Sequence, residues 1–366
     1  MIIKDVIKHI EAIAPISSAL KFDNPGLQIG SFEEQVHGIY LCLDLTQNTL
    51  NEALNLKTNL IITHHPLIYE PIKTLNFRNK EAQLIKDIIN NNLNIYSAHT
   101  NLDASKKGIN IAAAELLGLK NVTFLKQLPD SLIKISVFTP SDYVEKVSEA
   151  MFKQGAGIIG DYKKCSYRVS GTGTFEPEEF TNPFIGNKKS FNEVPEEKIE
   201  VIANKWNLNN ILKAIYNSHP YEEPAIDIFP LLNDDKNYGF GIVGELTKEL
   251  TFEEFSKLLK EKLNLKNFKY TKGKSNIIKK VAYCGGSGAD LLTAAIANNC
   301  DVFVTADIKY HTYHNAQNNI YLIDAGHYET EYPGIIYLYN YLKNIINNVE
   351  IHLSSISTNP IEYYQI

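Results

Sequence analysis

Two histidines stand next to each other in the stretch Thr63-His64-His65-Pro66. The residues before them, 59–62, form a short apolar run that is typical of a buried strand. Adjacent side chains on extended backbone point in opposite directions, so the two imidazoles suit one metal ion poorly and two ions well. In sites with two metals, the ions lie about 3.5–4 Å apart. Taken alone, the pair is equally compatible with a solvated loop that happens to carry two histidines.

Two further segments carry metal-binding residue types, each just after a short apolar run. The first holds His99 and Asp103, and the second holds His327 and Glu331. A spacing of four places His327 and Glu331 on one face of a first helical turn. Each pair also has a simpler explanation. The first could be a turn-forming aspartate with a hydrogen-bonded histidine, and the second could be a surface pair.

Together the three segments supply three imidazoles and two carboxylates. This ligand set suits Zn, Mn, Fe or Ni rather than Ca or Mg alone. We therefore predict two divalent metal ions per chain, with one carboxylate bridging them. The predicted ligands are His64, His65, Asp103, His327 and Glu331, with Glu331 as the bridge.

Two other segments are candidates for roles beside the metal ions. Asp307 and His311 follow an expected strand with helical i,i+4 spacing, which predicts substrate contacts, support for the ligands or a plain helix start. The turn at residues 285–288 is rich in glycine and precedes an expected helix. It matches neither a phosphate-binding loop nor a dinucleotide fingerprint, so close backbone packing is favoured over anion binding.

The elements that position these residues alternate between strand and helix over residues 2–117 and again after residue 240. Nearly all-apolar strands predict mainly parallel sheets with both faces covered, in an α/β fold. Polar residues gather after the strands, where open α/β sheets bind ligands. The last helix is expected at about 333–346, with Pro333 near its start.

The pattern changes near Pro129, where half-polar strands begin. Two successive β-α-β patterns in this part of the chain predict an inserted ferredoxin-like α+β domain. Residues 171–186 are expected to be rich in loops. The predicted division is an α/β lobe at 1–128, the insert at 129–238 and a second α/β lobe at 239–366.

Composition limits the function classes. The net charge of −6 and the presence of only two arginines, Arg78 and Arg168, disfavour long nucleic acids as partners. Four widely spaced cysteines without a Cys-x-x-Cys pair fit a reduced cytoplasmic protein. No apolar run reaches the length of a membrane span, so no membrane partner is expected.

Six segments, in this order, resemble the signature of the GTP cyclohydrolase I type 2 homolog family, also called Nif-three-like proteins. The resemblance covers nearly the whole chain and implies a toroidal homohexamer with a dinuclear metal site on the five ligands named above. Phe22 and Pro25 differ from the residues that are common in the family. Both lie outside the ligand set, so the difference is expected to affect local packing and not metal binding. The segments are Phe22–Gly30, Thr63–Leu67, His99–Asp103, Cys284–Gly288, Thr305–His311 and Gly326–Glu331.

The insert carries the motif His219-Pro220-Tyr221-Glu222-Glu223-Pro224, which is similar to one in CutA-type, PII-like trimeric proteins. A hexameric ring and a trimeric insert fit one symmetry, a dimer of trimers. In that arrangement the inserts would cluster on the three-fold axis and narrow access to the metal sites.

These observations predict a metal-dependent hydrolase of a small molecule, with a nucleotide as one candidate. His64 and Asp103 would hold one ion, and His65 and His327 the other. His99 is the candidate general acid/base, because histidine titrates in the useful range. The alternative is a non-catalytic metal- or nucleotide-sensing assembly, in which the insert is a regulatory module.

Overall fold

The computed structural model describes residues 1–364. The chain forms two compact units, a larger one from residues 1–127 and 237 onwards, and a smaller one from residues 128–236. The larger unit is a mixed α/β structure with two sheets, and it carries all of the predicted site residues. Among the described helices, none combines the length and the apolarity that a membrane crossing requires.

The first sheet of the larger unit has the strand order β1-β4-β3-β2-β15. Its three middle strands are completely buried, as the apolar runs predict, and they pair in parallel. Helices α1 and α11 pack on one face, and helices α2 and α3 pack on the other. The strands are β1 (Gly26–Ile29), β2 (Gly38–Cys42), β3 (Leu60–Thr63), β4 (Asn94–Ser97) and β15 (Glu350–Leu353), and the helices are α1 (Ile3–Ile13), α2 (Gln47–Asn55), α3 (Lys80–Asn90) and α11 (His327–Ile345).

The second sheet has the order β11-β14-β13-β12-β10-β5. Among its described strands, β12, β13 and β14 pair in parallel, while β5, β10 and β11 pair antiparallel. The prediction of mainly parallel sheets is therefore wrong for this sheet. The antiparallel strands are partly exposed, and antiparallel pairing tolerates one solvated face. The strands are β5 (Lys120–Gln127), β10 (Gly239–Thr251), β11 (Lys269–Thr271), β12 (Ile277–Tyr283), β13 (Val302–Thr305) and β14 (Tyr321–Asp324).

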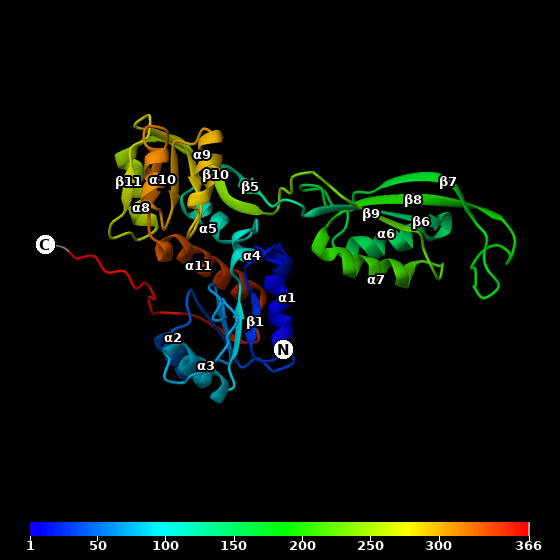
Figure 1. Cartoon of the computed structure of the whole chain (residues 1–366), viewed down its shortest axis with the longest axis horizontal. Helices are drawn as coiled ribbons and strands as arrows, with labels where there is room; N and C mark the ends of the chain where they lie inside the picture. Colours follow the sequence, from blue (N-terminus) through cyan, green and yellow to red (C-terminus); the bar gives the residue numbers. More distant parts are fainter. Residues whose placement is uncertain (365–366) are drawn as a thin grey trace. The chain divides into compact units, whose positions relative to one another are not determined.

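The helices of this half cover both faces of the second sheet. Helices α5 and α8 pack on one face, and α9 and α10 pack on the other. Figure 1 shows α8, α9 and α10 around this sheet, with α5 next to α11. The helices are α5 (Ile109–Leu116), α8 (Phe252–Lys262), α9 (Leu292–Ala297) and α10 (Tyr310–Ala316).

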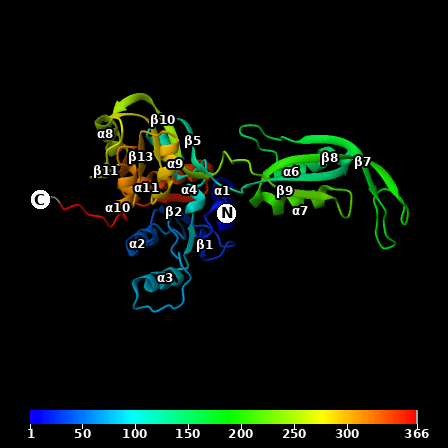
Figure 2. The same ribbon diagram turned by 45° about the horizontal axis from the view of Figure 1, so that its top comes forward.

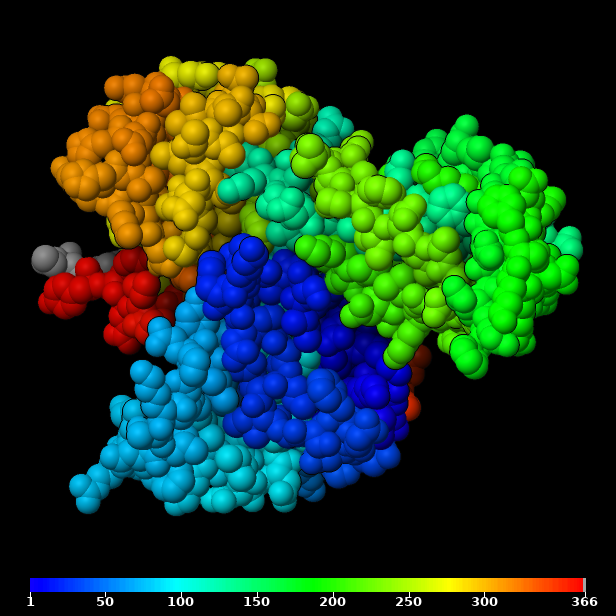
Figure 3. Space-filling model, turned by 45° about the vertical axis from the view of Figure 1, so that its right-hand side comes forward, coloured from blue at the N-terminus to red at the C-terminus, as the bar shows by residue number. Residues whose placement is uncertain are grey.

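The two sheets do not follow the two chain segments that the sequence assigned to separate lobes. Strand β5 belongs to the N-terminal segment but completes the second sheet, and strand β15 belongs to the C-terminal segment but completes the first. Each exchanged strand lies at the edge of its sheet, where it supplies hydrogen-bond partners to a neighbour that would otherwise be open. The red C-terminal segment that follows β15 lies between the orange and light-blue parts of the larger unit (Figure 3).

Helix α11 begins at His327 and contains Pro333. His327 and Glu331 therefore lie in its first turns, as their spacing predicts, whereas the expected range of about 333–346 began six residues too late. Gly326, with a positive φ of 89°, turns the chain into the helix. At Gly334 a Cβ atom would lie 2.2 Å from Cγ1 of Ile109, so glycine allows α11 to approach α5 closely.

The smaller unit contains one antiparallel sheet with the strand order β7-β8-β6-β9. Its elements follow each other as β-α-β-β-α-β, and both helices lie on the same face (Figure 2). Residues 171–174, expected in a loop, lie within β7, because their threonines favour extended backbone. The elements are β6 (Leu132–Pro140), α6 (Val144–Lys153), β7 (Tyr167–Phe175), β8 (Asn192–Asn204), α7 (Leu208–Ser218) and β9 (Ile226–Pro230).

Candidate metal centre

The three segments with metal-binding residues converge in the larger unit, around the carboxylate of Glu331. His65 Nε2 lies 3.0 Å from Glu331 Oε2, and His327 Nε2 lies 3.0 Å from Glu331 Oε1. The Nε2 atoms of the two histidines are 3.2 Å apart. The parallel strands β3 and β4 end at the same sheet edge, and the first turns of α11 bring Glu331 to it.

His64 approaches the same carboxylate and a second one. Its Nε2 lies 3.7 Å from Glu331 Oε1 and 3.7 Å from Asp103 Oδ1. Asp103 ends the short helix α4 (Thr100–Asp103), which follows β4. All five predicted ligands therefore meet at one place, around the carboxylate of Glu331.

The imidazoles are oriented by hydrogen bonds from their Nδ1 atoms. His64 Nδ1 lies 2.8 Å from the carbonyl of Ala98, which can only accept, so Nδ1 carries the proton and Nε2 keeps its lone pair. Carboxylates play the same role for three other histidines, the arrangement that commonly supports metal-binding imidazoles. The pairs are His65 with Asp44 at 2.7 Å, His99 with Asp23 at 2.7 Å and His327 with Asp307 at 2.6 Å.

Sequence reasoning did not identify Asp23 or Asp44. Asp44 follows the buried strand β2 almost at once, and Asp23 lies in the turn-rich segment before β1, so both stood at places where such support could have been sought. Thr358, whose hydroxyl donates to the second oxygen of Asp44, is more than 300 positions away in the chain and gave no local signal.

The residues present fit metal ions. Among the described residues, His64 Nε2, Asp103 Oδ1 and Glu331 Oε2 are buried polar atoms without a hydrogen-bond partner. Such atoms are costly unless something compensates them. Imidazole nitrogens and carboxylate oxygens are the donors that divalent transition metals prefer.

The electrostatics of the cluster favour a cation. Burial and the charge of Glu331 raise the pKa of Asp103 well above its usual value. Burial also opposes ionisation of Glu331, but His64 and the other histidines outweigh it, and its pKa lies well below the usual value. Two buried carboxylates thus compete for compensating positive charge, which a bound cation supplies.

His99 lies in the cluster as well. Its ring centroid is 5.1 Å from that of His64 and 5.5 Å from that of His65, and one donor nitrogen from each of the three rings falls within a 4.8 Å group. A second such group joins His65, His327 and Glu331. The position of His99 therefore suits a metal ligand as well as the predicted acid/base.

Asp307 and His311 are not the helical i,i+4 pair that their spacing predicts. Asp307 precedes α10 and has a positive φ of 53°, so the two side chains do not share a helix face. Asp307 supports His327, whereas His311 is exposed and its described ring contacts are with Tyr310 and His314. At Gly286 a Cβ atom would lie 2.0 Å from Glu331 Oε1, which supports the close-packing explanation of the glycine turn.

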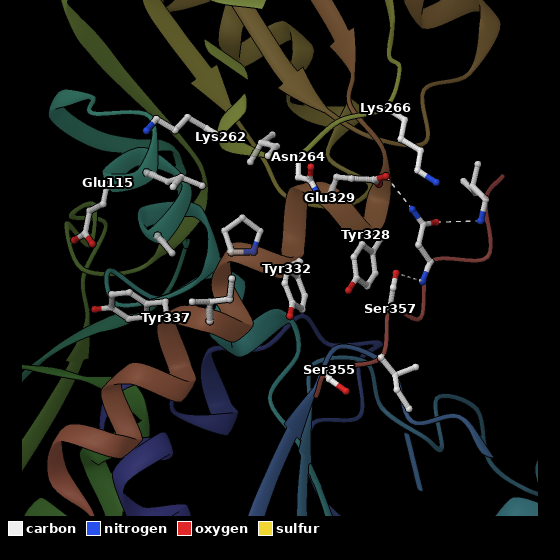
Figure 4. Close-up of a pocket in the computed structure, with 18 of the residues that line it drawn as sticks. Glu115, Lys262, Asn264, Lys266, Tyr328, Glu329, Tyr332, Tyr337, Ser355 and Ser357 are labelled. Atoms are coloured by element: carbon white, nitrogen blue, oxygen red, sulfur yellow. Dashed lines mark hydrogen bonds between the residues drawn. The ribbon is translucent and has the colours of Figure 1, made fainter. Parts of the chain in front are cut away.

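One cavity reaches the candidate site, and a second lies elsewhere along α11. The first, of about 660 Å³, reaches His65 and Asp44 from the side of β2 and α3, and its lining includes Pro66, Leu67 and Lys80. The other, of about 750 Å³, lies between α11 and the C-terminal segment. Figure 4 shows Tyr328 and Tyr332 on α11 beside it, with Lys262 near its upper rim. Asn359 of the C-terminal segment donates a hydrogen bond to Glu329 at 2.8 Å.

Comparisons by sequence and by structure both relate this chain to one protein family. A family model described as Duf34/NIF3 (NGG1p interacting factor 3) matches residues 1–360. A protein of Halalkalibacterium halodurans named GTP cyclohydrolase 1 type 2 homolog is 36% identical over 363 residues, covering 98% of each chain. A protein of the same name from Staphylococcus epidermidis is 35% identical over 368 residues, covering 99% of this chain and 100% of the other. The crystal structure of a Bacillus cereus protein related to NIF3 has a TM-score of 0.88 at 33% identity and covers 100% of this chain and 99% of its own.

Proposed function

The chain belongs to the Duf34/NIF3 family, and from that premise we propose that it is a dinuclear metal-dependent hydrolase of a nucleotide or a related small molecule. The observation that carries the proposal is the position of Glu331. Its two carboxylate oxygens lie 3.0 Å from Nε2 of His65 and from Nε2 of His327, at the centre of a buried cluster.

In this proposal His64 and Asp103 hold one ion, and His65 and His327 hold the other. Glu331 is shared between the two. The donor set suits Zn, Mn, Fe or Ni. Bound ions of this kind supply Lewis acidity and make water a better nucleophile near neutral pH.

His99 would act as the general acid/base that gives or accepts a proton during hydrolysis. Its Nδ1 is held at 2.7 Å by Asp23, which leaves Nε2 to give or accept a proton toward the cluster. Burial opposes the charge of Asp23, but hydrogen bonds from His99 and Thr100 prevail and lower its pKa to about 2. A carboxylate that stays charged holds the imidazole of His99 in one orientation.

The surroundings of His65 favour a small substrate. A cavity of about 660 Å³ is in the range that holds nucleotide-sized ligands rather than polymers. The net charge of −6 adds to the case against long nucleic acids. Relatives named GTP cyclohydrolase 1 type 2 homolog support a nucleotide as the first substrate to test.

Assembly is part of the proposal. We expect a homohexamer built as a dimer of trimers, in which the two sheets of the larger unit act as two lobes of one discontinuous α/β unit. The smaller unit would be a ferredoxin-like, CutA/PII-like insert, which its β-α-β-β-α-β order supports. Its clustering on the three-fold axis would select small substrates.

Elemental analysis of the purified chain, followed by turnover assays with GTP and a panel of nucleotides and phosphoesters, tests the proposal. We expect close to two transition-metal ions per chain and turnover of at least one compound. His99→Ala should keep the metal ions and lose turnover. Loss of metal in that variant would make His99 a ligand, and saturable nucleotide binding without any turnover would favour a sensing role.

A further inference from the structure

The smaller unit has a cavity of its own, of about 470 Å³, which the metal chemistry does not use. Its walls come from β6, β7, β8, the loop between β7 and β8, and the motif that begins at His219. Four aromatic side chains line it: Phe138, Phe175, Phe184 and Tyr221. The rings of Phe175 and Tyr221 are neighbours, with centroids 6.3 Å apart and planes tilted by 54°.

The charged side chains that line this cavity have one sign, while Lys198, whose ammonium lies 5.9 Å from the ring centroid of Phe138, pairs with Glu200. Among the described residues that line it, every charged side chain is a glutamate, and there is no lysine, arginine or histidine. A concave surface with charges of one sign concentrates ions of the opposite sign. Phosphate groups are repelled here, so the cavity disfavours nucleotides. The glutamates are Glu176, Glu196, Glu222 and Glu223.

Hydrogen bonds hold this wall in place. His219 Nε2 lies 2.9 Å from the carbonyl of Phe138, and the backbone N–H of Tyr221 donates to His219 Nδ1 at 3.1 Å. Both ring nitrogens are therefore used, and His219 anchors the motif instead of binding a ligand. The hydroxyl of Tyr221 donates to Glu196 Oε1 at 2.7 Å, which joins an aromatic ring and a carboxylate of the wall.

The backbone of the opposite wall is adapted to this carboxylate. At Gly173 in β7 a Cβ atom would lie 2.1 Å from Glu196 Oε2, so glycine leaves the space that the carboxylate occupies. The backbone N–H of Asn182 donates to Glu222 Oε1 at 3.0 Å and ties the loop between β7 and β8 to the motif. Contacts among the lining residues thus fix the positions of Glu196, Tyr221 and Glu222 in the cavity wall.

We propose that this cavity binds a small organic ammonium ion. Aromatic faces attract an ammonium group through their quadrupoles, and carboxylates form charge-assisted hydrogen bonds with it. A hard metal ion would use the oxygens but gain nothing from four aromatic rings. In this proposal the smaller unit binds a cationic ligand that has no part in the chemistry of the metal centre. A nucleotide is then not the ligand of this cavity.

Calorimetric titration of the full chain tests it, with choline and putrescine as probes at constant ionic strength. Choline carries a quaternary ammonium that relies on the aromatic walls, and putrescine carries primary ammonium groups that can donate to the glutamates. We expect saturable binding of at least one probe at one site per chain. Inorganic phosphate should neither bind to this site nor reduce the affinity for the probe.

Matched variants locate the binding. Phe184→Ala should weaken binding about 10-fold, whereas Phe180→Ala, which removes a 98% exposed ring from the same loop outside the cavity, should leave it unchanged. Glu196→Gln keeps an acceptor for Tyr221 but removes a charge, and it should also weaken binding, whereas Glu193→Gln on the same strand should not.

Two results would overturn the proposal. One is the absence of saturable binding of both probes to the full chain. The other is equal weakening by Glu196→Gln and Glu193→Gln, which would mean that the probes respond to the general negative charge of the unit. Thermal unfolding of each variant distinguishes a lost ligand from a lost fold. If Phe184→Ala unfolds early, the glutamate pair alone decides the outcome.

Discussion

The metal centre and the cavity of the smaller unit use the same residue types in opposite ways. At the candidate metal centre, His64, His65 and His327 each use Nδ1 for a hydrogen bond to a supporting oxygen. Their Nε2 atoms point toward Glu331, whose carboxylate is buried. In the smaller unit, His219 uses both ring nitrogens within the protein. A histidine that keeps one nitrogen free beside buried carboxylates can bind a metal, whereas one with both nitrogens bonded supports the fold.

The carboxylates differ in the same way. Glu331 is buried and lies among histidines, while the glutamates of the smaller unit line an open cavity with aromatic rings. Burial makes an uncompensated charge expensive, so the first arrangement favours positive charge held close to the carboxylate. Exposed carboxylates are already solvated, so the second suits a ligand that enters and leaves.

Removing the central carboxylate should have the largest effect. Glu331→Ala takes away the group that faces three histidines, so we expect loss of most of both metal ions from the purified chain, measured by elemental analysis. Glu253→Ala, which removes an exposed carboxylate from α8 of the same unit, is the control and should keep them. Full occupancy in the Glu331 variant would refute the bridging role.

The support of His65 should matter next. Asp44→Asn keeps the shape of the side chain but removes the charge that orients the imidazole, and changes of this kind weaken metal binding by about 10- to 100-fold. Metal titration with a competing chelator would measure the loss, which should fall on one of the two ions. Equal weakening of both ions would show that the two sites are not separable as proposed.

The C-terminal segment should give a smaller effect on the same ion. Thr358→Val removes the hydroxyl that donates to Asp44, a hydrogen bond expected to contribute about 1 kcal/mol, or about fivefold in affinity. Thr358→Ser restores a hydroxyl and should recover the affinity. A valine variant with the serine variant's affinity would mean that the C-terminal segment does not act on the metal centre.

The smallest effect on metal binding is expected from removing the smaller unit. A chain that joins residue 128 to residue 238 through a short flexible linker should still fold and hold its metal ions, because the larger unit contains all of the candidate ligands. Several such chains that are insoluble or free of metal would contradict this independence.

Light scattering on the full and shortened chains sharpens the same comparison. We expect a hexamer for the full chain, and turnover of larger substrates only after the smaller unit is removed. A full-length monomer or dimer at micromolar concentration would refute the ring. If the shortened chain selects substrates by size as the full chain does, the smaller unit does not restrict access to the metal sites. That result would leave the proposed metal centre unaffected.

Local sequence was enough to predict most elements and to place the candidate metal-binding residues after the ends of strands. Strand β3 and the two histidines after it were predicted because a short apolar run and a following proline define both the strand and its end. Family membership, which the motifs predicted together, is confirmed by the match over residues 1–360. The antiparallel strands of the second sheet were not predicted, because strand pairing depends on segments that lie far apart in the chain.

The sequence by itself determined which residue types follow which strands, because hydrophobic periodicity and turn residues act over a few neighbouring positions. Only the tertiary structure decided that β5 and β15 exchange between the two sheets, that Asp44 and Thr358 support His65, and which histidine Asp307 contacts. Those partners are separated by 20 to more than 300 positions. Their meeting depends on how whole sheets and helices pack, and no local pattern encodes it.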